Sequence, residues 1–329
     1  MKIVLQTRDE PGLAERVRAA AGAHGAAVVE VTDDRSAVRE IADADAFYGT
    51  ITPELLGAAT RLRWIQSPVI GLERTMFPEL VGHPAVLTNP RGIFSDDIAD
   101  HVLGFVLCFA RGFHRHVRTQ LQRRWVRWSE EQVIHLPDAT IGIFGLGGIG
   151  TAVAQRARAH GMRVLAVDAR RAPQAAASST EGAASSTEGV ERLWGPEGLG
   201  EMLGQSDFVA ICAPETPETR GLFDAPALGR MKRGAYLINI GRGKIVRLDA
   251  LVAALESGHL AGAGLDVFEV EPLPADHPLW GMENVIVTPH MAGLGPHTAA
   301  RRHEILLENV RRFAAGQELI NAVDKTRWF

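Results

Sequence analysis

The stretch Thr140-Ile-Gly-Ile-Phe-Gly-Leu-Gly-Gly-Ile-Gly150 decides the fold. An apolar strand pattern, residues 140–144, runs into a glycine-rich turn, and a helical pattern follows to about His160. In such a turn the first glycine permits the tight bend, the second lets a pyrophosphate approach the backbone, and the third lets helix and strand pack closely. The pyrophosphate would lie at the positive end of the new helix. The G-x-G-x-x-G turn, which predicts dinucleotide binding, consists of Gly145, Leu146, Gly147, Gly148, Ile149 and Gly150.

A carboxylate follows the next strand pattern, Val164 to Val167. Asp168 stands where an acidic residue accepts the adenosine ribose hydroxyls of a bound dinucleotide. A carboxylate here repels a 2′-phosphate and favours NAD, whereas Arg170 and Arg171, directly after it, could pair with that phosphate in NADP. NAD is therefore the preferred cofactor, with NADP as the open alternative.

Strand and helix patterns alternate along most of the 329 residues, which is typical of a parallel α/β architecture with about 150 residues per domain. Residues 95 to about 113 predict one long buried helix with Ser95 as its N-cap. Before this helix, five strand patterns occur at residues 3–5, 28–31, 46–48, 64–66 and 86–88. After it, six patterns predict a doubly wound sheet, at residues 140–144, 164–167, 208–212, 236–240, 263–267 and 285–287.

Composition and charge exclude several classes of protein. Hydrophobic residues make up 46% and charged residues 22%, as in an ordinary globular chain. The formal net charge of -4 gives no bulk attraction to nucleic acid or to an anionic membrane. Cys108 and Cys212 have no paired spacing, so we expect buried thiols in a reducing compartment rather than a disulfide or zinc site. Without a signal peptide or a membrane-spanning pattern, a cytoplasmic protein is expected.

Two segments interrupt this regular pattern. The heptapeptide AASSTEG occurs at 176–182 and again at 183–189, and its small polar residues predict a mobile surface insertion. The other segment is an arginine cluster without an intervening acid. It is interpreted as a solvated helix face or a subunit contact, and alternatively as a positive rim that attracts anionic substrates. The cluster comprises Arg111, Arg115, Arg118, Arg123, Arg124 and Arg127.

Three later segments combine the end of a strand with a reactive side chain. Arg242 lies between two glycines in Asn239-Ile-Gly-Arg-Gly243, and its guanidinium suits a carboxylate. Glu271 follows a strand pattern, and His290 lies in Thr288-Pro-His-Met-Ala-Gly293. Reduction of a carbonyl by hydride leaves an alkoxide that needs a proton, which a histidine oriented by a carboxylate can donate. The arginine would clamp the substrate and polarise its carbonyl, and no histidine has metal-ligand spacing.

Taken together, the motifs resemble the D-2-hydroxyacid dehydrogenase family, which includes glyoxylate/hydroxypyruvate reductases and phosphoglycerate dehydrogenases. The resemblance covers nearly the whole chain, through GLGGIG, PETRGLF at 217–223, NIGRG, GLDVFEVEPLP and TPHMAG in family order. It implies two Rossmann-like parallel-sheet domains, with a doubly wound dinucleotide-binding domain, residues 101–290, inserted into a flavodoxin-like substrate domain, residues 1–100 and 291–329. It also implies a homodimer with the long helix in or beside the contact.

The same resemblance implies roles for individual residues. Arg242 would bind the substrate carboxylate and carbonyl, and His290, paired with Glu271, would donate the proton. Asp266 would help to hold the nicotinamide carboxamide. Backbone amides at Val69, Ile70 and Gly71 would receive the substrate carboxylate. Further cofactor contacts are expected at Ala213, Pro214, Thr219, Ile240, Gly241, His290 and Gly293.

Two departures narrow the expected substrate. Glu271 stands where formate dehydrogenases carry glutamine, and Ile70 stands where phosphite-oxidising members carry lysine. The expected activity is therefore NAD(P)H-dependent reduction of a small 2-keto acid to the D-2-hydroxy acid. Two alternatives stay open: a dehydrogenase of a phosphorylated or sulfonated hydroxy acid, and a nicotinamide-sensing binding protein that resembles the co-repressors of this fold.

Overall fold

The computed structural model describes residues 1–7, 10–73, 75–170 and 189–328, and the chain divides into two compact units. Unit 1 consists of Met1–Ile93 and Pro296–Phe329, and unit 2 of Phe94–Gly295. The boundaries expected from the sequence, at residues 100 and 290, both fall inside unit 2. At residue 100 the reason is helix α5 (Ser95–Ala110), which packs on α7 (Gly148–Ala159) and belongs as a whole to unit 2.

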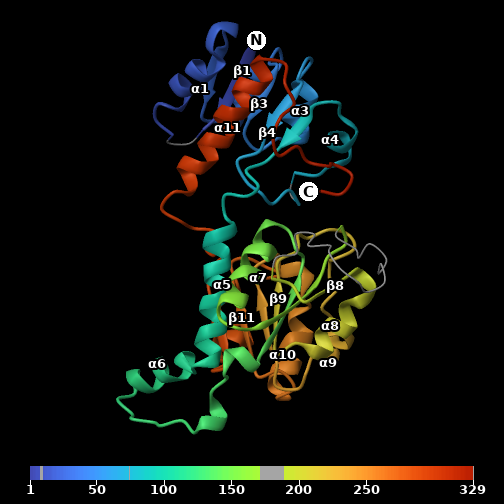
Figure 1. Cartoon of the computed structure of the whole chain (residues 1–329). Helices are drawn as coiled ribbons and strands as arrows, with labels where there is room; N and C mark the ends of the chain where they lie inside the picture. The colour runs from blue at the N-terminus through green and yellow to red at the C-terminus, as the bar shows by residue number, and fades with distance from the viewer. Residues whose placement is uncertain (8–9, 74, 171–188, 329) are drawn as a thin grey trace. The chain divides into compact units, whose positions relative to one another are not determined.

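Unit 1 is built on a parallel five-stranded sheet with the order β2-β1-β3-β4-β5. This is the flavodoxin-like order. Strands are added on one side of β1 first and then on the other side, so the switch point lies between β1 and β3. Every strand lies where the sequence predicted one, and Figure 1 shows α11, from the end of the chain, beside the strands from its start. The strands are β1 (Lys2–Gln6), β2 (Ala27–Val31), β3 (Ala46–Tyr48), β4 (Trp64–Gln66) and β5 (Val86–Thr88). The helices are α1 (Leu13–Ala21), α2 (Asp34–Ile41), α3 (Pro53–Ala58), α4 (Pro78–Gly82) and α11 (Thr298–Ala314).

Unit 2 is built on a parallel seven-stranded sheet with the order β12-β11-β10-β9-β6-β7-β8. From β6 outward this is the doubly wound Rossmann order with one strand added, so the predicted fold class is confirmed. The short strand β8 (Arg192–Trp194) was not predicted, because one leucine and one tryptophan after an arginine make no strand pattern. The other strands are β6 (Thr140–Phe144), β7 (Arg163–Val167), β9 (Phe208–Ile211), β10 (Tyr236–Asn239), β11 (Gly262–Leu265) and β12 (Val285–Val287).

The helix predicted for residues 95 to 113 is shorter in the structure. α5 ends at Ala110, Gly112 takes a left-handed backbone with φ of 68°, and α6 (Phe113–Leu121) begins directly after it. A left-handed glycine is a common end to a helix, so the break has a local cause. Ser95 was expected to cap α5, but it is the first helical residue, and Phe94 occupies the capping position without a side-chain hydrogen bond.

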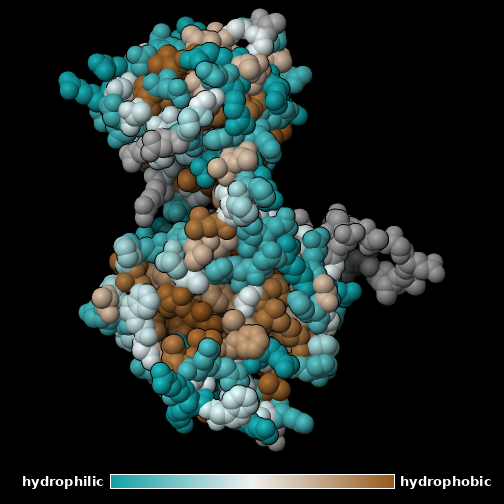
Figure 2. Space-filling model, turned by 90° about the vertical axis from the view of Figure 1, so that its left-hand side faces the viewer, coloured by the Kyte–Doolittle hydropathy of each residue, from teal (hydrophilic) through white to brown (hydrophobic). Residues whose placement is uncertain are grey.

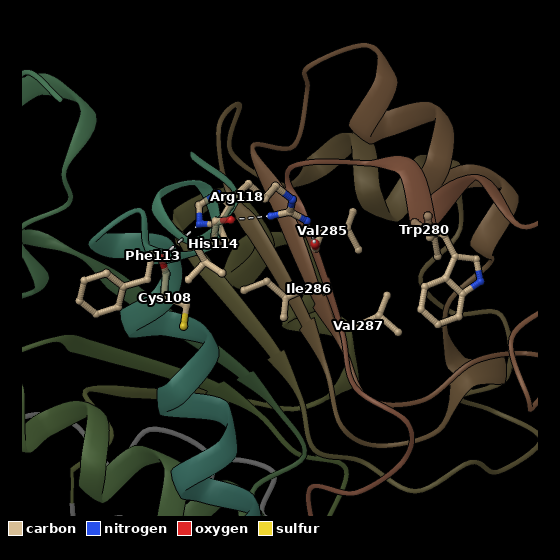
Figure 3. A pocket seen from close by; sticks show the side chains of 10 residues that line it. Cys108, Phe113, His114, Arg118, Trp280, Val285, Ile286 and Val287 are labelled. Carbon is tan, nitrogen blue, oxygen red and sulfur yellow. Dashed lines mark hydrogen bonds between the residues drawn. The ribbon is translucent and has the colours of Figure 1, made fainter. Parts of the chain in front are cut away.

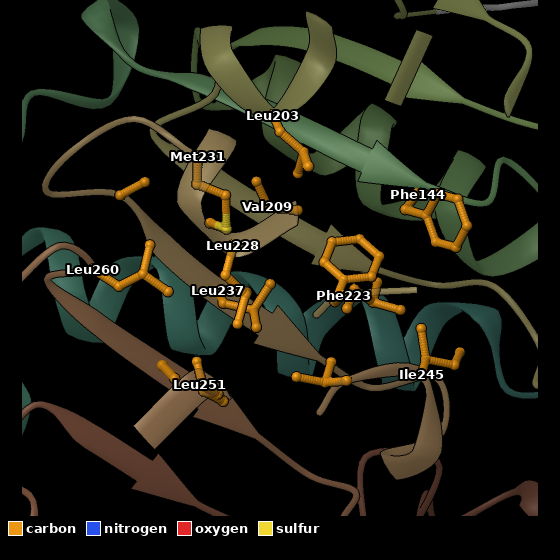
Figure 4. Close-up of a cluster of buried hydrophobic side chains, with 14 of the residues drawn as sticks. Phe144, Leu203, Val209, Phe223, Leu228, Met231, Leu237, Ile245, Leu251 and Leu260 are labelled. Carbon is orange, nitrogen blue, oxygen red and sulfur yellow. The ribbon is translucent and has the colours of Figure 1, made fainter. Parts of the chain in front are cut away.

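Apolar side chains cover both faces of the seven-stranded sheet, which is why its strands read as continuous apolar runs. One face carries α5 and α7. The other carries α8 (Leu199–Gln205), α9 (Ala225–Arg230) and α10 (Leu248–Glu256). Both faces are therefore closed, and the loops at the carboxyl ends of the strands are left to form a site. Figure 4 shows the second face with Phe144, Leu203, Val209, Phe223, Leu228, Met231, Leu237, Ile245, Leu251 and Leu260.

Three expectations concern single segments. None of the helices in the described part of the chain combines the length and apolarity that spanning a bilayer requires. Cys108 and Cys212 are free thiols, and burial raises the pKa of both, that of Cys212 to about 12. The AASSTEG duplication lies outside the described residues except for Gly189, and so does Arg171.

Candidate active site

The glycine-rich turn lies at the switch point of the seven-stranded sheet, between the ends of β6 and β9. A Cβ atom on Gly145 would lie 2.7 Å from the backbone nitrogen of Ala213, which follows β9. A Cβ on Gly150 would lie 2.0 Å from the carbonyl oxygen of Gly145, so both positions need glycine for close backbone packing. A Cβ on Gly147 would meet no described atom within 4 Å. The turn therefore has open space at the start of α7, where the pyrophosphate of a dinucleotide fits.

Asp168 follows β7 and fixes this turn in place. One carboxylate oxygen accepts a hydrogen bond of 2.7 Å from the amide of Leu146, and the other accepts one of 2.8 Å from the amide of Arg170. An anionic group is thus held beside the glycine turn, where ribose recognition was expected. The ribose contact itself stays a prediction.

The segment after β9 is braced by its own side chains. Thr219 Oγ1 donates to the carbonyl of Pro214 at 2.8 Å and accepts from the amide of Thr216 at 2.8 Å. Glu215 is buried and binds Arg220 through a contact of 2.7 Å. Of this set, the sequence motifs pointed to Pro214 and Thr219 but not to the buried Glu215, whose partner only the folded loop supplies. The bracing keeps Ala213 against the glycine turn.

Arg242 leaves β10 in a turn that Asn239 holds. The side chain of Asn239, which is buried, accepts from the amide of Gly241 at 3.1 Å and donates to the carbonyl of Arg242 at 3.1 Å. Arg242 Nη1 donates to the carbonyl of Gly241 at 2.7 Å. No role for Asn239 was predicted, although an asparagine at a strand end before a glycine is a typical turn signal. Ile240 and Gly241 are buried within the same turn.

Glu271 and His290 lie within hydrogen-bond distance, although 19 positions separate them in the chain. His290 Nδ1 is 2.8 Å from Glu271 Oε2, and the other carboxylate oxygen accepts from the amide of Phe268 at 3.0 Å. The imidazole is about half exposed, at 51%. Because Nδ1 faces the carboxylate, Nε2 is the ring nitrogen that remains to meet a substrate.

Asp266 anchors the loop that carries His290. Its side chain is buried and accepts hydrogen bonds from Thr288 Oγ1 at 2.6 Å and from the amides of Met291 and Ala292 at 2.9 Å each. Its backbone carbonyl accepts from the amide of His290 at 2.8 Å. The expected contact with the nicotinamide carboxamide stays a prediction. The structure gives Asp266 an additional role that no sequence pattern indicated, because its three loop partners lie more than 20 residues away.

The predicted substrate loop lies in unit 1, after β4, whereas every other predicted site residue lies in unit 2. Ser67 Oγ binds both the carbonyl of Val69, at 2.9 Å, and its amide, at 3.2 Å. Asn89 Nδ2 donates to the carbonyl of Ile70 at 3.3 Å. Side chains therefore hold the loop before Gly71, and the amide of Val69, expected to receive a carboxylate, already has a partner.

The loops that follow β6, β7, β9, β10, β11 and β12 all leave the carboxyl edge of one parallel sheet, where ligands bind in this architecture. Around the switch point they bring together a dinucleotide turn, a guanidinium and a carboxylate–imidazole pair. Among the residues that the structure describes, no group of three or more His, Cys, Asp or Glu side chains could hold a metal ion. Fold and site together define an oxidoreductase that uses a nicotinamide dinucleotide.

Comparisons with known proteins agree with this class. The family model described as "D-isomer specific 2-hydroxyacid dehydrogenase, NAD binding domain" matches residues 103–292. The chain therefore belongs to the D-isomer specific 2-hydroxyacid dehydrogenase family. It is an NAD(P)-dependent dehydrogenase that acts on the CH–OH group of a hydroxy acid.

Individual relatives cover almost the whole chain. A glyoxylate reductase from Korarchaeum cryptofilum is 34% identical over 297 residues, which are 88% of this chain and 85% of the relative. The D-isomer specific 2-hydroxyacid dehydrogenase from Xanthobacter autotrophicus Py2, solved with NADPH and MES, is 31% identical with a TM-score of 0.79, covering 99% of this chain and 100% of that one. An NADPH-dependent glyoxylate/hydroxypyruvate reductase from Sinorhizobium meliloti, solved with NADP and sulfate, is 26% identical with a TM-score of 0.81, covering 100% and 99%.

Proposed function

We propose that the chain reduces a small 2-keto acid of the glyoxylate or hydroxypyruvate type to the D-2-hydroxy acid. The observation that carries this proposal is the 2.8 Å contact between His290 Nδ1 and Glu271 Oε2, at the sheet edge that also holds Arg242 and the glycine turn. Relatives named glyoxylate reductase support the substrate class.

In the proposed reaction, His290 holds the proton that the product needs. A nicotinamide dinucleotide held at the glycine turn would supply the hydride that the carbonyl carbon accepts. Glu271 accepts the hydrogen bond from Nδ1 and stabilises the imidazolium. Nε2 then donates its proton to the carbonyl oxygen, which becomes the alcohol. After the transfer the neutral ring keeps its Nδ1 proton toward Glu271, and the next proton is taken up at Nε2.

Arg242 acts on the other end of the substrate. Its planar guanidinium matches a carboxylate, and its charge stabilises the negative charge that develops on the carbonyl oxygen. Asn239 holds the turn and thereby the direction in which Arg242 leaves the strand. For unit 1, carboxylate binding by the backbone at Val69, Ile70 and Gly71 stays a prediction, and the amide of Val69 donates to Ser67 Oγ at 3.2 Å.

A panel of 2-keto acids, followed by the absorbance of the reduced nicotinamide, tests this proposal. We expect the fastest turnover with glyoxylate or hydroxypyruvate, a D-configured product from hydroxypyruvate, and a lower KM for NADH than for NADPH, because Asp168 repels a 2′-phosphate. A clear preference for NADPH would contradict the role given to Asp168. If a phosphorylated or sulfonated keto acid turned over faster than glyoxylate and hydroxypyruvate, the substrate class would be phosphorylated or sulfonated hydroxy acids instead. Tight NADH binding without turnover of any acid would overturn the proposal.

We further propose that the protein is a homodimer in which unit 2 contacts a second copy of itself. Large apolar side chains are exposed on α6 and just after it, with Val117 at 55%, Leu121 at 81% and Trp125 at 89%. In Figure 1, α6 and the segment after it extend away from the seven-stranded sheet, and Figure 2 shows a broad apolar patch on unit 2. An exposed apolar patch of this kind is typical of an interface.

An apolar pocket lies beside α6, between α5, α6 and strand β12 (Figure 3). Arg118 ties α6 to this strand by donating to the carbonyl of Val285 at 3.3 Å. The exposed apolar side chains of α6 and the apolar pocket lie on the same unit, so a two-fold axis could bring each of them against its counterpart in a second copy. The pocket is lined by Cys108, Phe113, His114, Val117, Arg118, Leu279, Trp280, Val285, Ile286 and Val287.

Light scattering on the purified chain is expected to give twice the monomer mass of 35.6 kDa. Val117→Glu places a charge in the pocket wall and should shift the mass toward the monomer at micromolar concentration. Val86→Glu, an exposed valine of unit 1, is the matched control and should leave the mass unchanged. A monomeric wild type would contradict the proposal, as would a Val117→Glu variant that remains dimeric.

A further inference from the structure

A second histidine lies beside the loop that carries His290. His101 is on α5, where its ring packs edge-on against Phe105 at 4.8 Å between centroids. Its Nε2 atom lies 3.0 Å from Thr288 Oγ1 and 3.9 Å from Asp266 Oδ1. The side chain is only 20% exposed. Helix α5 therefore reaches the end of β12 through one polar side chain.

The chemistry of the three groups fixes the direction of their hydrogen bonds. An ionised carboxylate can only accept, so the 2.6 Å contact between Thr288 Oγ1 and Asp266 Oδ1 uses the hydroxyl proton. The hydroxyl oxygen can then only accept from His101. We therefore assign the ring proton of His101 to Nε2, which gives a chain from His101 through Thr288 to Asp266.

This series of hydrogen bonds ends at Asp266, which holds the loop that carries His290. Asp266 also accepts from the amides of Met291 and Ala292, directly after His290, and from the amide of His290 itself. His290 has a left-handed backbone, with φ of 53°. A non-glycine residue keeps such a backbone only where its surroundings hold it. Asp266 provides that hold, and His101 and Thr288 fix the orientation of the Asp266 carboxylate.

The environment of His101 suits a neutral donor. Burial lowers the pKa of His101, and the nearby Asp266 carboxylate offsets part of that shift. The neutral ring can therefore donate a hydrogen bond to Thr288 at neutral pH.

We propose that His101 is a positioning residue for proton transfer: with Thr288 and Asp266 it holds the loop so that His290 Nε2 meets the substrate carbonyl. The inference rests on the proposed function, in which His290 is the proton donor. It requires a hydrogen-bond donor at residue 101 and a hydroxyl at residue 288, but no direct contact of either with substrate.

Two variants of His101 separate this role from simple packing. His101→Leu removes the donor and is expected to lower kcat about 10- to 100-fold, the effect of a misplaced catalytic group, while the dissociation constant of NADH stays within about twofold. His101→Gln keeps an N–H donor and should restore kcat to within about threefold of wild type. His259→Leu is the matched control, because His259 Nε2 lies 3.1 Å from the carbonyl of Leu228, a backbone contact of unit 2 outside this chain of bonds. Its kcat should equal that of wild type.

Hydrogen exchange gives a readout that does not depend on turnover. In His101→Leu, and in Thr288→Val as a second variant should the first fail to fold, the amides of Met291 and Ala292 should exchange faster than in wild type. Amides within β6 and β9 should not change. Exchange could be faster at Met291 and Ala292 in the variants while the wild type reduces no 2-keto acid. In that case the positioning role of His101 would be supported and the proposed function would be contradicted.

Three results would overturn the positioning role. The first is unchanged exchange at Met291 and Ala292 in both variants. The second is a His101→Gln variant as slow as His101→Leu. The third is a loss of kcat accompanied by an equal loss of NADH affinity, which would indicate general disorder of unit 2.

Discussion

Glutamine in place of His290 is expected to lower kcat for 2-keto acid reduction about 10²- to 10⁴-fold, the range that a general acid contributes. The amide of glutamine can donate a hydrogen bond to the carbonyl oxygen but cannot release a proton to it. Binding should change little, because the glycine turn and Arg242 lie on other loops. Initial rates at saturating cofactor, with the best acid of the panel, give the comparison, and a titration with NADH checks that the cofactor still binds.

The histidine control for this experiment is His160→Gln, at the exposed end of α7, which should keep the wild-type rate. A thermal unfolding curve for each variant shows whether the loop change has affected stability. If His290→Gln retained more than about a tenth of the wild-type kcat, proton donation by His290 would be excluded, since even the smallest expected contribution of a general acid exceeds that factor.

The sequence predicted the sheets well because parallel strands buried on both faces read as apolar runs. The runs at 140–144 and 285–287 coincide with β6 and β12. The secondary-structure predictions that failed involve a single residue or a very short element. The backbone of Gly112 divides the predicted long helix, and β8 is too short to form a pattern. No local pattern shows which unit a helix packs against, so the predicted domain boundary at residue 100 differs from the start of unit 2 at Phe94 and stays a prediction.

In the candidate site too, residues within a local motif could be predicted, whereas contacts between distant parts of the chain could not. Arg242, Glu271 and His290 are recognisable because each lies in its own motif at a strand end. The groups that hold them are not, because their partners are distant in the chain: the contact of His101 with Thr288 joins residues 187 positions apart. A histidine in the middle of an apolar helix is interpreted from the sequence as a core residue. Only the folded structure shows that the ring of His101 contacts a hydroxyl group.

Alanine in place of Arg242 is expected to lower kcat/KM for the 2-keto acid about 10³-fold, with both a higher KM and a lower kcat. The higher KM follows from the lost clamp on the substrate carboxylate. The lower kcat follows because charge developing on the carbonyl oxygen loses the guanidinium that stabilises it. Arg242→Lys keeps the charge without the planar fork and should recover only part of the loss.

Arg247 provides the matched control for Arg242, because it lies in the same segment but on its exposed side. Its guanidinium is 3.5 Å from Asp249 and 3.7 Å from Glu269, and its side chain is 54% exposed. Arg247→Ala should therefore change kcat/KM by less than about twofold, since an exposed ion pair contributes little. If Arg242→Ala lowered kcat/KM no more than this control does, the carboxylate clamp would have to be sought elsewhere, first in the loop of unit 1 that Ser67 and Asn89 hold. If Arg242→Ala instead raised KM alone, Arg242 would bind the ground state and the transition state equally and would take no part in polarising the carbonyl.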